Sequence, residues 1–191
     1  MNRRKALFGL AGLGGVAVAA YAGMTWKLWN KKPDLFFLEN SKDLIHSLVE
    51  TIIPKTDTPG AGELNIHEFV IRMVKECSEV KAQNKFLLGL TEVESYCNSE
   101  FDKSFSLCTQ SEKIQTMRYM EDRDKLLPGI AGKAQHKFLG RSFFATLKEY
   151  TTLGYFTSQP GSSEALRYVP IPGRYIACEK ISPSEKAWAT N

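Results

Sequence analysis

The stretch SKDLIHSLVETIIP, residues 41–54, predicts a short amphipathic helix. Its apolar side chains recur three or four residues apart and so share one helical face: Leu44, Ile45, Leu48, Val49, Ile52 and Ile53. Ser41 is a residue type that caps helix N-termini, and Pro54 cannot continue a helix. A helix with one apolar face needs other elements to cover that face, which favours a helical bundle.

Further segments downstream show the same helical spacing, each introduced by a capping residue. Asn65, with a glutamate three residues later, predicts the start of a second helix. Ser78 predicts the start of a third helix, over residues 78–102. Thr109 and Glu112 form a capping-box pattern, which predicts the start of a fourth.

The last and longest helix is predicted from about Lys133 to Leu153, and Gly154 stands where a C-cap glycine belongs. No segment alternates apolar and polar residues as a strand would. The predicted fold is therefore all-α, a small bundle of about five helices with a long irregular C-terminal tail rich in Pro, Gly and Tyr. Residues 41–191 would form a single helical domain, with residues 23–40 as a linker before it.

The first 22 residues have the composition of an export signal. Arg3, Arg4 and Lys5 precede a run from Ala6 to Met24 that has no charged side chain. Ala20-Tyr21-Ala22 is a small-x-small pattern that predicts cleavage before Gly23. The paired arginines and the glycine-rich apolar stretch resemble a twin-arginine signal.

Two alternatives for this segment stay open, a general secretory signal and an uncleaved membrane anchor. Ala6–Met24 would be just long enough as a helix to cross a bilayer core of about 30 Å. Trp26 and Trp29, followed by Lys31 and Lys32, suit a membrane interface. Cleavage would remove three basic residues and lower the formal net charge from +4 to +1, so the charge predicts no nucleic-acid partner.

Four cysteines in an exported chain raise the question of disulfides. Cys97 and Cys108 flank the turn after the third predicted helix, so a disulfide between them is the favoured pairing. Cys178, in the tail, could be free, paired with Cys77, or bonded to another chain. The sequence has no C-x-x-C pair and therefore encodes neither a zinc ribbon nor covalent haem attachment.

Nothing in the sequence predicts a catalytic, cofactor-binding or metal-binding residue. The three histidines, His46, His67 and His136, fall on three separate predicted helices with no i, i+4 partner. A metal site needs converging ligands, and this spacing does not indicate convergence. The motifs G-x-S-x-G, H-E-x-x-H and the P-loop are all absent.

The tail from Gly154 to Ile181 combines turn-forming residues with aromatic rings: Gly154, Gly161, Gly173, Pro160, Pro170, Pro172, Tyr155, Phe156, Tyr168 and Tyr175. Such a segment is costly to order unless it packs against something.

Two stretches resemble the signatures of the gluconate 2-dehydrogenase subunit 3 family. One is TIIPKTDTPGA at residues 51–61, and the other is TTLGYFTSQPG at residues 151–161 with ALRY at 165–168, PIPGRY at 170–175 and Cys178. The resemblance runs from about Leu44 to Ile181. It implies a non-catalytic small subunit of a periplasmic dehydrogenase that oxidises a sugar or sugar acid.

The resemblance also implies partners for this chain. The main one is a large FAD-dependent subunit of the glucose-methanol-choline type, and a cytochrome carrying c-type haem is often a third subunit. The small subunit is expected to help the flavoprotein mature and to carry it through the twin-arginine translocase. This chain itself would then hold no cofactor.

We hypothesise that the tail contacts the flavoprotein, because rigid exposed rings suit an interface. The candidate contact residues are Tyr155, Phe156, Leu166, Arg167, Tyr168, Pro170, Pro172, Arg174, Tyr175 and Cys178. The alternative is that the tail wraps the helices and its rings complete the core. Two other functions compete, a chain that binds flavin or sugar itself and a membrane-held scaffold.

Overall fold

The computed structural model describes residues 30–124 and 141–171, together with residues 173, 174, 178, 182 and 185–189. Within these residues the fold is helical, as predicted, and the β-structure is a single isolated bridge. The elements are α2 Leu35–Asn40, α3 Lys42–Ile52, α4 Ile66–Cys77, α5 Val80–Phe101, η1 Phe105–Leu107, α6 Gln110–Asp124, α8 Phe143–Thr157 and η2 Gly161–Ala165. None of the described helices is both long and apolar enough to cross a membrane.

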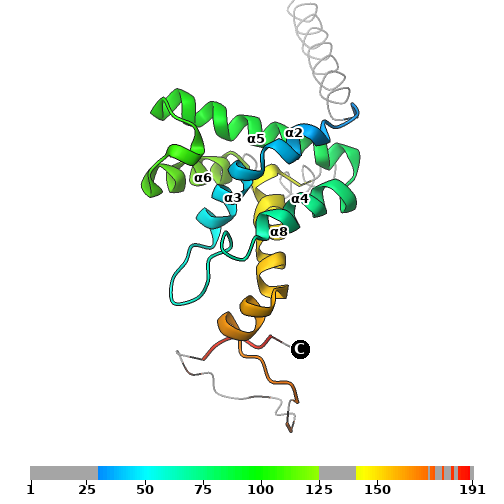
Figure 1. Cartoon of the computed structure of the whole chain (residues 1–191), viewed down its shortest axis with the longest axis vertical. Coiled ribbons are helices and arrows are strands. Elements are labelled where there is room, and N and C mark those ends of the chain that lie inside the picture. The colour runs from blue at the N-terminus through cyan, green and yellow to red at the C-terminus, as the bar shows by residue number, and fades with distance from the viewer. Residues whose placement is uncertain are drawn as a thin grey trace, which may run out of the picture.

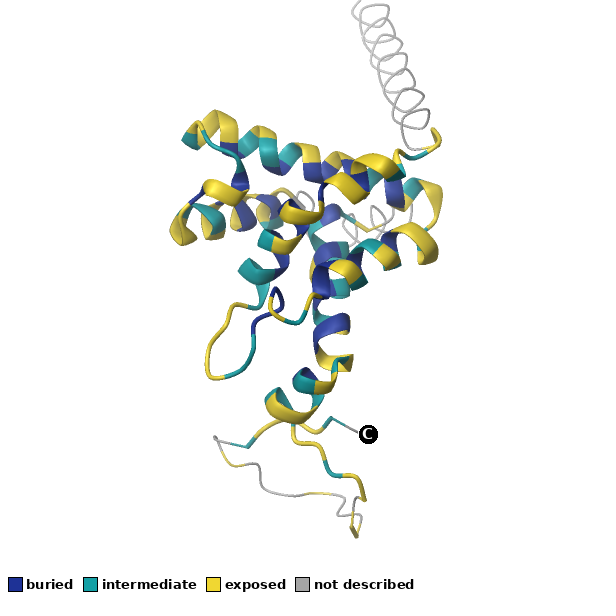
Figure 2. Ribbon diagram, in the orientation of Figure 1, coloured by how far each residue is buried: buried dark blue, intermediate teal, exposed yellow. Residues whose placement is uncertain are grey.

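The helices α2 to α6 form a body into which the first half of α8 inserts (Figure 1). α8 packs against α3, α4, α5 and α6, so it is the central element of the fold. The faces that the helices turn toward one another are buried, and the buried colour follows α8 into the body (Figure 2). Fully buried side chains from four helices meet there: Leu48, Val70, Leu90 and Leu147.

The C-terminal half of α8 extends out of the body and carries η2 and the tail at its far end (Figure 1). Burial falls along the same direction, so that most residues beyond Gly161 are exposed or half-buried (Figure 2). The second half of the signature at 151–161 therefore lies where the chain leaves the helical body.

The segment predicted as a linker contains α2, which packs on α3 and α4 through the fully buried Leu38. Asp34 caps this helix, because its Oδ1 accepts a hydrogen bond of 2.9 Å from the Phe37 amide. The prediction that Ser41 caps α3 with its side chain is wrong. α2 runs almost directly into α3, and the Ser41 hydroxyl donates to the Phe37 carbonyl instead, at 2.8 Å.

The capping box at Thr109 and Glu112 is confirmed. The Thr109 amide donates to Glu112 Oε2 at 2.7 Å, and the Glu112 amide donates to Thr109 Oγ1 at 3.4 Å. The side-chain caps predicted at Asn65 and Ser78 are wrong. Asn65 adopts the left-handed conformation, with φ 54°, and Ser78 precedes α5 while its hydroxyl donates to the Met73 carbonyl at 3.2 Å.

The long final helix differs from its prediction at both ends. Ser142 is extended and caps the helix, since its Oγ accepts from the Ala145 amide at 3.3 Å, so α8 begins at Phe143. The predicted stretch from 133 to 140 lies outside the described residues. At the other end the helix continues through Gly154 to Thr157, so Gly154 is not a C-cap.

Gly154 serves close packing instead. A Cβ at this position would lie 2.6 Å from Phe69 Cδ1, which brings the backbone of α8 directly against α4. Gly89 on α5 does the same on another side, because a Cβ there would lie 2.1 Å from Phe143 Cγ. Two glycines thus set how closely α8 approaches its neighbours.

Candidate partner interface

The first signature forms a loop between α3 and α4 that Glu50 holds together. Glu50 Oε1 accepts from the Lys55 amide at 3.1 Å, and Oε2 accepts from the Gly62 amide at 2.7 Å. The Ala61 amide also donates to the Ile53 carbonyl at 2.9 Å and so closes the base of the loop. A Cβ on Gly60 would lie 2.6 Å from both Glu50 oxygens and 2.8 Å from the Lys55 backbone nitrogen, so a larger residue would force the loop to shift.

The second signature packs against this loop through Tyr155. The Tyr155 hydroxyl donates to the Pro59 carbonyl at 2.8 Å and lies 3.3 Å from Thr58 Oγ1. Two stretches about a hundred residues apart in the chain are therefore joined by one side chain. Tyr155 is only 2% exposed, so its predicted role as a contact residue for a partner is wrong, and its ring belongs to the core.

After α8 the chain turns sharply through Ser158 and Gly161. Ser158 Oγ donates to the Tyr155 carbonyl at 2.6 Å and accepts from the Gly161 amide at 3.1 Å. A Cβ on Gly161 would lie 1.9 Å from the Tyr155 carbonyl oxygen, which no side chain could tolerate. This turn fixes the direction in which the tail leaves the helix.

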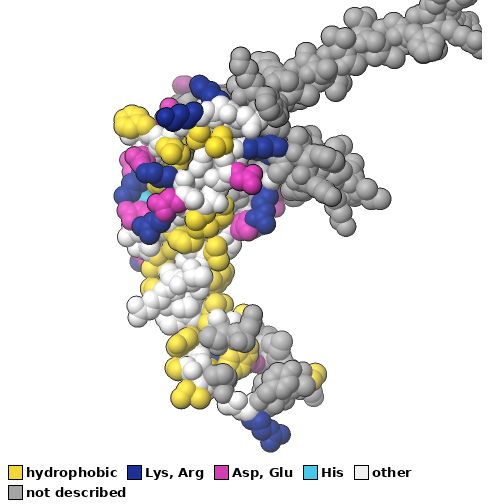
Figure 3. Space-filling view, turned by 90° about the vertical axis from the view of Figure 1, so that its right-hand side faces the viewer, with side chains coloured by type: hydrophobic (Ala, Val, Ile, Leu, Met, Phe, Trp, Pro, Cys, Tyr) yellow, Lys and Arg dark blue, Asp and Glu magenta, His cyan; other side chains and the backbone are white. Residues whose placement is uncertain are grey.

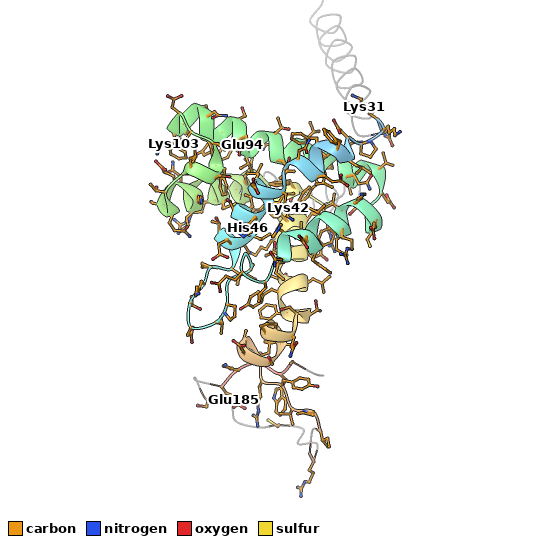
Figure 4. All side chains as sticks on the ribbon, viewed as in Figure 1. Lys31, Lys42, His46, Glu94, Lys103 and Glu185 are labelled. Carbon is orange, nitrogen blue, oxygen red and sulfur yellow. The ribbon has the colours of Figure 1, made fainter. Side chains whose placement is uncertain are left out.

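Arg167 closes the tail on itself. Its amide donates to the Ala187 carbonyl at 2.8 Å, and its carbonyl accepts from the Ala189 amide at 3.0 Å. Its guanidinium lies 4.2 Å from the Trp188 ring centroid and donates to Glu185 Oε1 at 2.6 Å. Lys186 Nζ also donates to the Glu164 carbonyl, and Figure 4 shows Glu185 at this end of the molecule, far from the body.

Exposed apolar side chains gather on this part of the chain. They are Leu153 and Phe156 on the outer half of α8, with Tyr168, Ile171 and Trp188 in the tail. Ile171 is the extreme case, with 84% of its surface exposed. On the face shown in Figure 3, several hydrophobic side chains lie on the lower, protruding part of the molecule, whereas most of the charged side chains lie on the body.

The predicted contact residues separate into distinct groups. Phe156, Arg167, Tyr168, Pro170, Arg174 and Cys178 are exposed, and Leu166 is half-buried. Pro172 and Tyr175 lie outside the described residues, as do Arg3 and Arg4 of the predicted export signal. Arg167 is exposed, yet its guanidinium already serves the tail itself through Glu185 and Trp188.

The prediction missed three exposed apolar residues, Leu153, Ile171 and Trp188. Leu153 lies three residues before Phe156, the spacing that places two side chains on one helical face, so the sequence carried a signal for it. No comparable signal marked Trp188, because its place beside Arg167 depends on the return of the tail.

The structure brings together two histidines that were expected to stay apart. The His46 and His67 rings meet edge to face, with centroids 4.9 Å apart, because α3 packs against α4. His67 is buried, and its Nδ1 has no hydrogen-bond partner. The pKa of His67 is lowered mainly by its burial, and further by the charges of His46 and then Lys42.

This pair does not make a metal site. Among the described residues no three His, Cys, Asp or Glu side chains are placed to hold a metal ion. His136 lies outside the described residues. His46 is exposed beside Lys42 on α3 (Figure 4), and the pair is best described as a polar joint between two helices.

The predicted disulfide between Cys97 and Cys108 is wrong, since all four cysteines are free thiols. Cys97 and Cys108 are both buried and close enough to interact, but Cys97 Sγ pairs with Thr116 Oγ1 at 3.4 Å. Burial raises the pKa of the Cys97 thiol to about 11. Cys77 and Cys178 are exposed.

The fold and the site together define a small helical protein with a protruding apolar end, whose two signature stretches pack against each other. A family model described as gluconate 2-dehydrogenase subunit 3 matches residues 39–173, which include the first stretch and most of the second. The chain belongs to the gluconate 2-dehydrogenase subunit 3 family. No curated protein and no solved structure matches it.

Proposed function

We propose that this chain is the accessory small subunit of an exported, FAD-dependent dehydrogenase for a sugar or sugar acid. The family name describes a subunit of a larger gluconate dehydrogenase, and the finer role rests on the shape of this chain. The FAD and the catalytic residues belong to a glucose-methanol-choline type partner. Where a cytochrome with c-type haem is present, it takes the electrons from that partner.

The observation that carries the proposal is the protruding apolar end, formed by the outer half of α8 and the tail. Exposed Phe, Tyr, Ile and Trp side chains are costly on a free subunit and typical of a surface that a partner covers. The turn at Gly161 and the hydrogen bonds of Arg167 with Ala187 and Ala189 order these parts of the end before binding, which lowers the entropy cost of association.

In this proposal the first 22 residues are the signal with which the small subunit directs the export of its flavoprotein partner. A flavoprotein must bind FAD as it folds, and twin-arginine export carries folded proteins. The small subunit would dock on the loaded flavoprotein and supply Arg3 and Arg4 as the signal for both chains. The complex would then function in the periplasm, either soluble or held at the inner membrane.

A tagged copy of the chain, isolated with its partners from the source organism, tests this function. We expect a flavoprotein to co-purify, with the absorbance of oxidised flavin assigned to that larger chain and a colourless small subunit after separation. Replacing Arg3 and Arg4 by lysine should leave both subunits in the cytoplasm. A yellow small subunit purified alone, or no flavoprotein in the isolate, would contradict the proposal.

A further inference from the structure

The helix α2 leaves one aromatic side chain largely exposed, and the next one partly exposed, at the entry to the body. Phe36 is 74% exposed and Phe37 is also exposed, although Leu38, the next residue, is fully buried. Leu38 thus anchors the helix on the body, while Phe36 stays largely exposed and Phe37 keeps 37% of its surface exposed. The described part of the chain leaves most of Phe36 uncovered, so this ring is available to something outside the chain.

The surroundings of this face are basic. Lys31 and Lys32 are exposed just before the helix, and Lys31 stands at the upper edge of the molecule in Figure 4. The nearby acidic groups are engaged: Glu39 forms an ion pair of 2.6 Å with Lys75, and the Asp34 carboxylate caps α2. Charge complementarity therefore favours an anionic surface next to Phe36.

The entry of the chain is fixed to the body rather than loosely attached. Asn84, which is buried on α5, donates through Nδ2 to the Lys31 carbonyl at 2.6 Å. This hydrogen bond fixes the position of the backbone at Lys31 relative to α5, close to where α2 begins. The preceding sequence is Trp26-Lys27-Leu28-Trp29, after the uncharged run from Ala6 to Met24.

Aromatic rings interleaved with lysines are the composition of segments that lie in the headgroup region of a bilayer. We propose that the Phe36 face, consisting of Lys31, Lys32, Phe36 and Phe37, rests on an anionic phospholipid surface. The docking does not depend on the fate of the export signal, since Trp26, Trp29 and the lysines follow the predicted cleavage before Gly23. It also does not rest on the proposed function.

This placement sets the orientation of the whole chain. Figure 4 places Lys31 at one extreme of the molecule, Lys103 at the opposite side of the body and Glu185 at the end of the tail. Because Lys31 and Glu185 lie at opposite ends of the described chain, lipid contact at the Phe36 face leaves the protruding apolar end free. A partner could then bind the tail while the subunit stays at the surface.

The test uses a reporter at the proposed contact and one at a matched position. Phe36→Cys and Leu107→Cys are made separately in the full chain with Cys77→Ser and Cys178→Ser, and labelled with an environment-sensitive fluorophore. Leu107 is 76% exposed and lies on η1, so it matches Phe36 in exposure but not in place. Cys97 and Cys108 stay unlabelled because they are buried.

Vesicles of phosphatidylethanolamine and phosphatidylglycerol are expected to shift the emission at position 36 to the blue and to leave position 107 unchanged. The shift should weaken at high salt and with Lys31→Gln and Lys32→Gln together. Phe37→Cys provides a second reporter if the first variant fails to fold. An unshifted emission at position 36 from the chain bound to vesicles, or an equal shift at position 107, would overturn the proposal.

Discussion

Tyr155 shows how one side chain can connect the two signatures. Its ring fills the core, and its hydroxyl donates to the Pro59 carbonyl at 2.8 Å. The composition that looked like a binding surface in the sequence therefore also builds a packed joint.

Tyr155→Phe should lower the free energy of unfolding by about 1 kcal/mol, because it keeps the ring but removes a partly buried hydrogen bond. Urea denaturation followed by circular dichroism measures the change. Tyr168→Phe is the matched control, since Tyr168 is exposed and should be neutral. Equal changes in the free energy of unfolding for the two variants would show that the hydrogen bond from Tyr155 to Pro59 has no net stabilising effect.

Gly89→Ala should be among the most damaging small substitutions, by roughly 3 kcal/mol or more, because the added methyl group overlaps the Phe143 side chain. The same urea titration measures this loss. Gly173→Ala serves as the control, since its Cβ would meet nothing within 4 Å. If Gly89→Ala proves as stable as Gly173→Ala, α5 and α8 do not pack as described.

His67 should make stability depend on pH. Its folded-state pKa lies below the usual 6.5, so the unfolded chain binds the proton more readily as the pH falls. The free energy of unfolding should be highest above pH 6.5 and should decline from there toward the lower folded-state pKa. Facing His67 are His46 and Lys42, which lower its pKa, and Glu68 and Asp43, which raise it.

Urea titrations at about pH 7.5 and about pH 5.5 isolate this effect, because the usual pKa of 4.5 puts the titration of Glu68 and Glu112 below this range. His67→Gln should have a flatter pH dependence than the original chain. A stability that rises as the pH falls to 5.5, or an equal slope in His67→Gln, would contradict the assignment.

At the scale of elements, the sequence predicted most of the helices, but of their side-chain caps only the one at Thr109 was correct. Thr109 and Glu112 satisfy each other within one turn, so a local pattern was enough to identify them. The Ser41 and Ser78 hydroxyls instead donate to the carbonyls of Phe37 and Met73. These hydrogen bonds depend on how consecutive helices are joined. The helix propensity of a single segment does not predict whether a serine hydroxyl caps the next helix or donates to a carbonyl of the preceding one.

Thr109→Ala should therefore lower the free energy of unfolding by about 1 kcal/mol, because it removes one half of the capping box of α6. Thermal unfolding followed by circular dichroism measures it. Thr152→Ala is the comparison variant and should change little, because this half-buried hydroxyl donates only within α8, to the Lys148 and Glu149 carbonyls. A Thr109 variant as stable as the Thr152 variant would mean that the capping hydrogen bond has no net effect.

Gly154 was predicted as the end of a helix because a glycine after an apolar stripe is the usual C-cap pattern. The structure places it inside α8, against Phe69. A glycine required by a left-handed turn and a glycine required by a neighbouring side chain look identical in sequence. Only the packing of α4 on α8 distinguishes them.

At the scale of the whole molecule, the sequence predicted exposure correctly for some residues of the tail and not for others. Phe156, Tyr168 and Pro170 are exposed at the protruding end, whereas Tyr155 is buried. Ile171 and Trp188 were missed because exposure depends on where the tail runs after Arg167 closes it. The meeting of His46 and His67 was missed for the same reason, since it follows from the packing of α3 on α4.

The central claim is that the protruding apolar end binds the flavoprotein. The direct test measures the affinity of the purified partner for the chain carrying Tyr168→Ala and Ile171→Ala, with Leu107→Ala as the control at an equally exposed site on the body. We predict at least about tenfold weaker binding for the tail variant and no change for the control. Unchanged affinity in the tail variant, with its helical content intact, would contradict the claim.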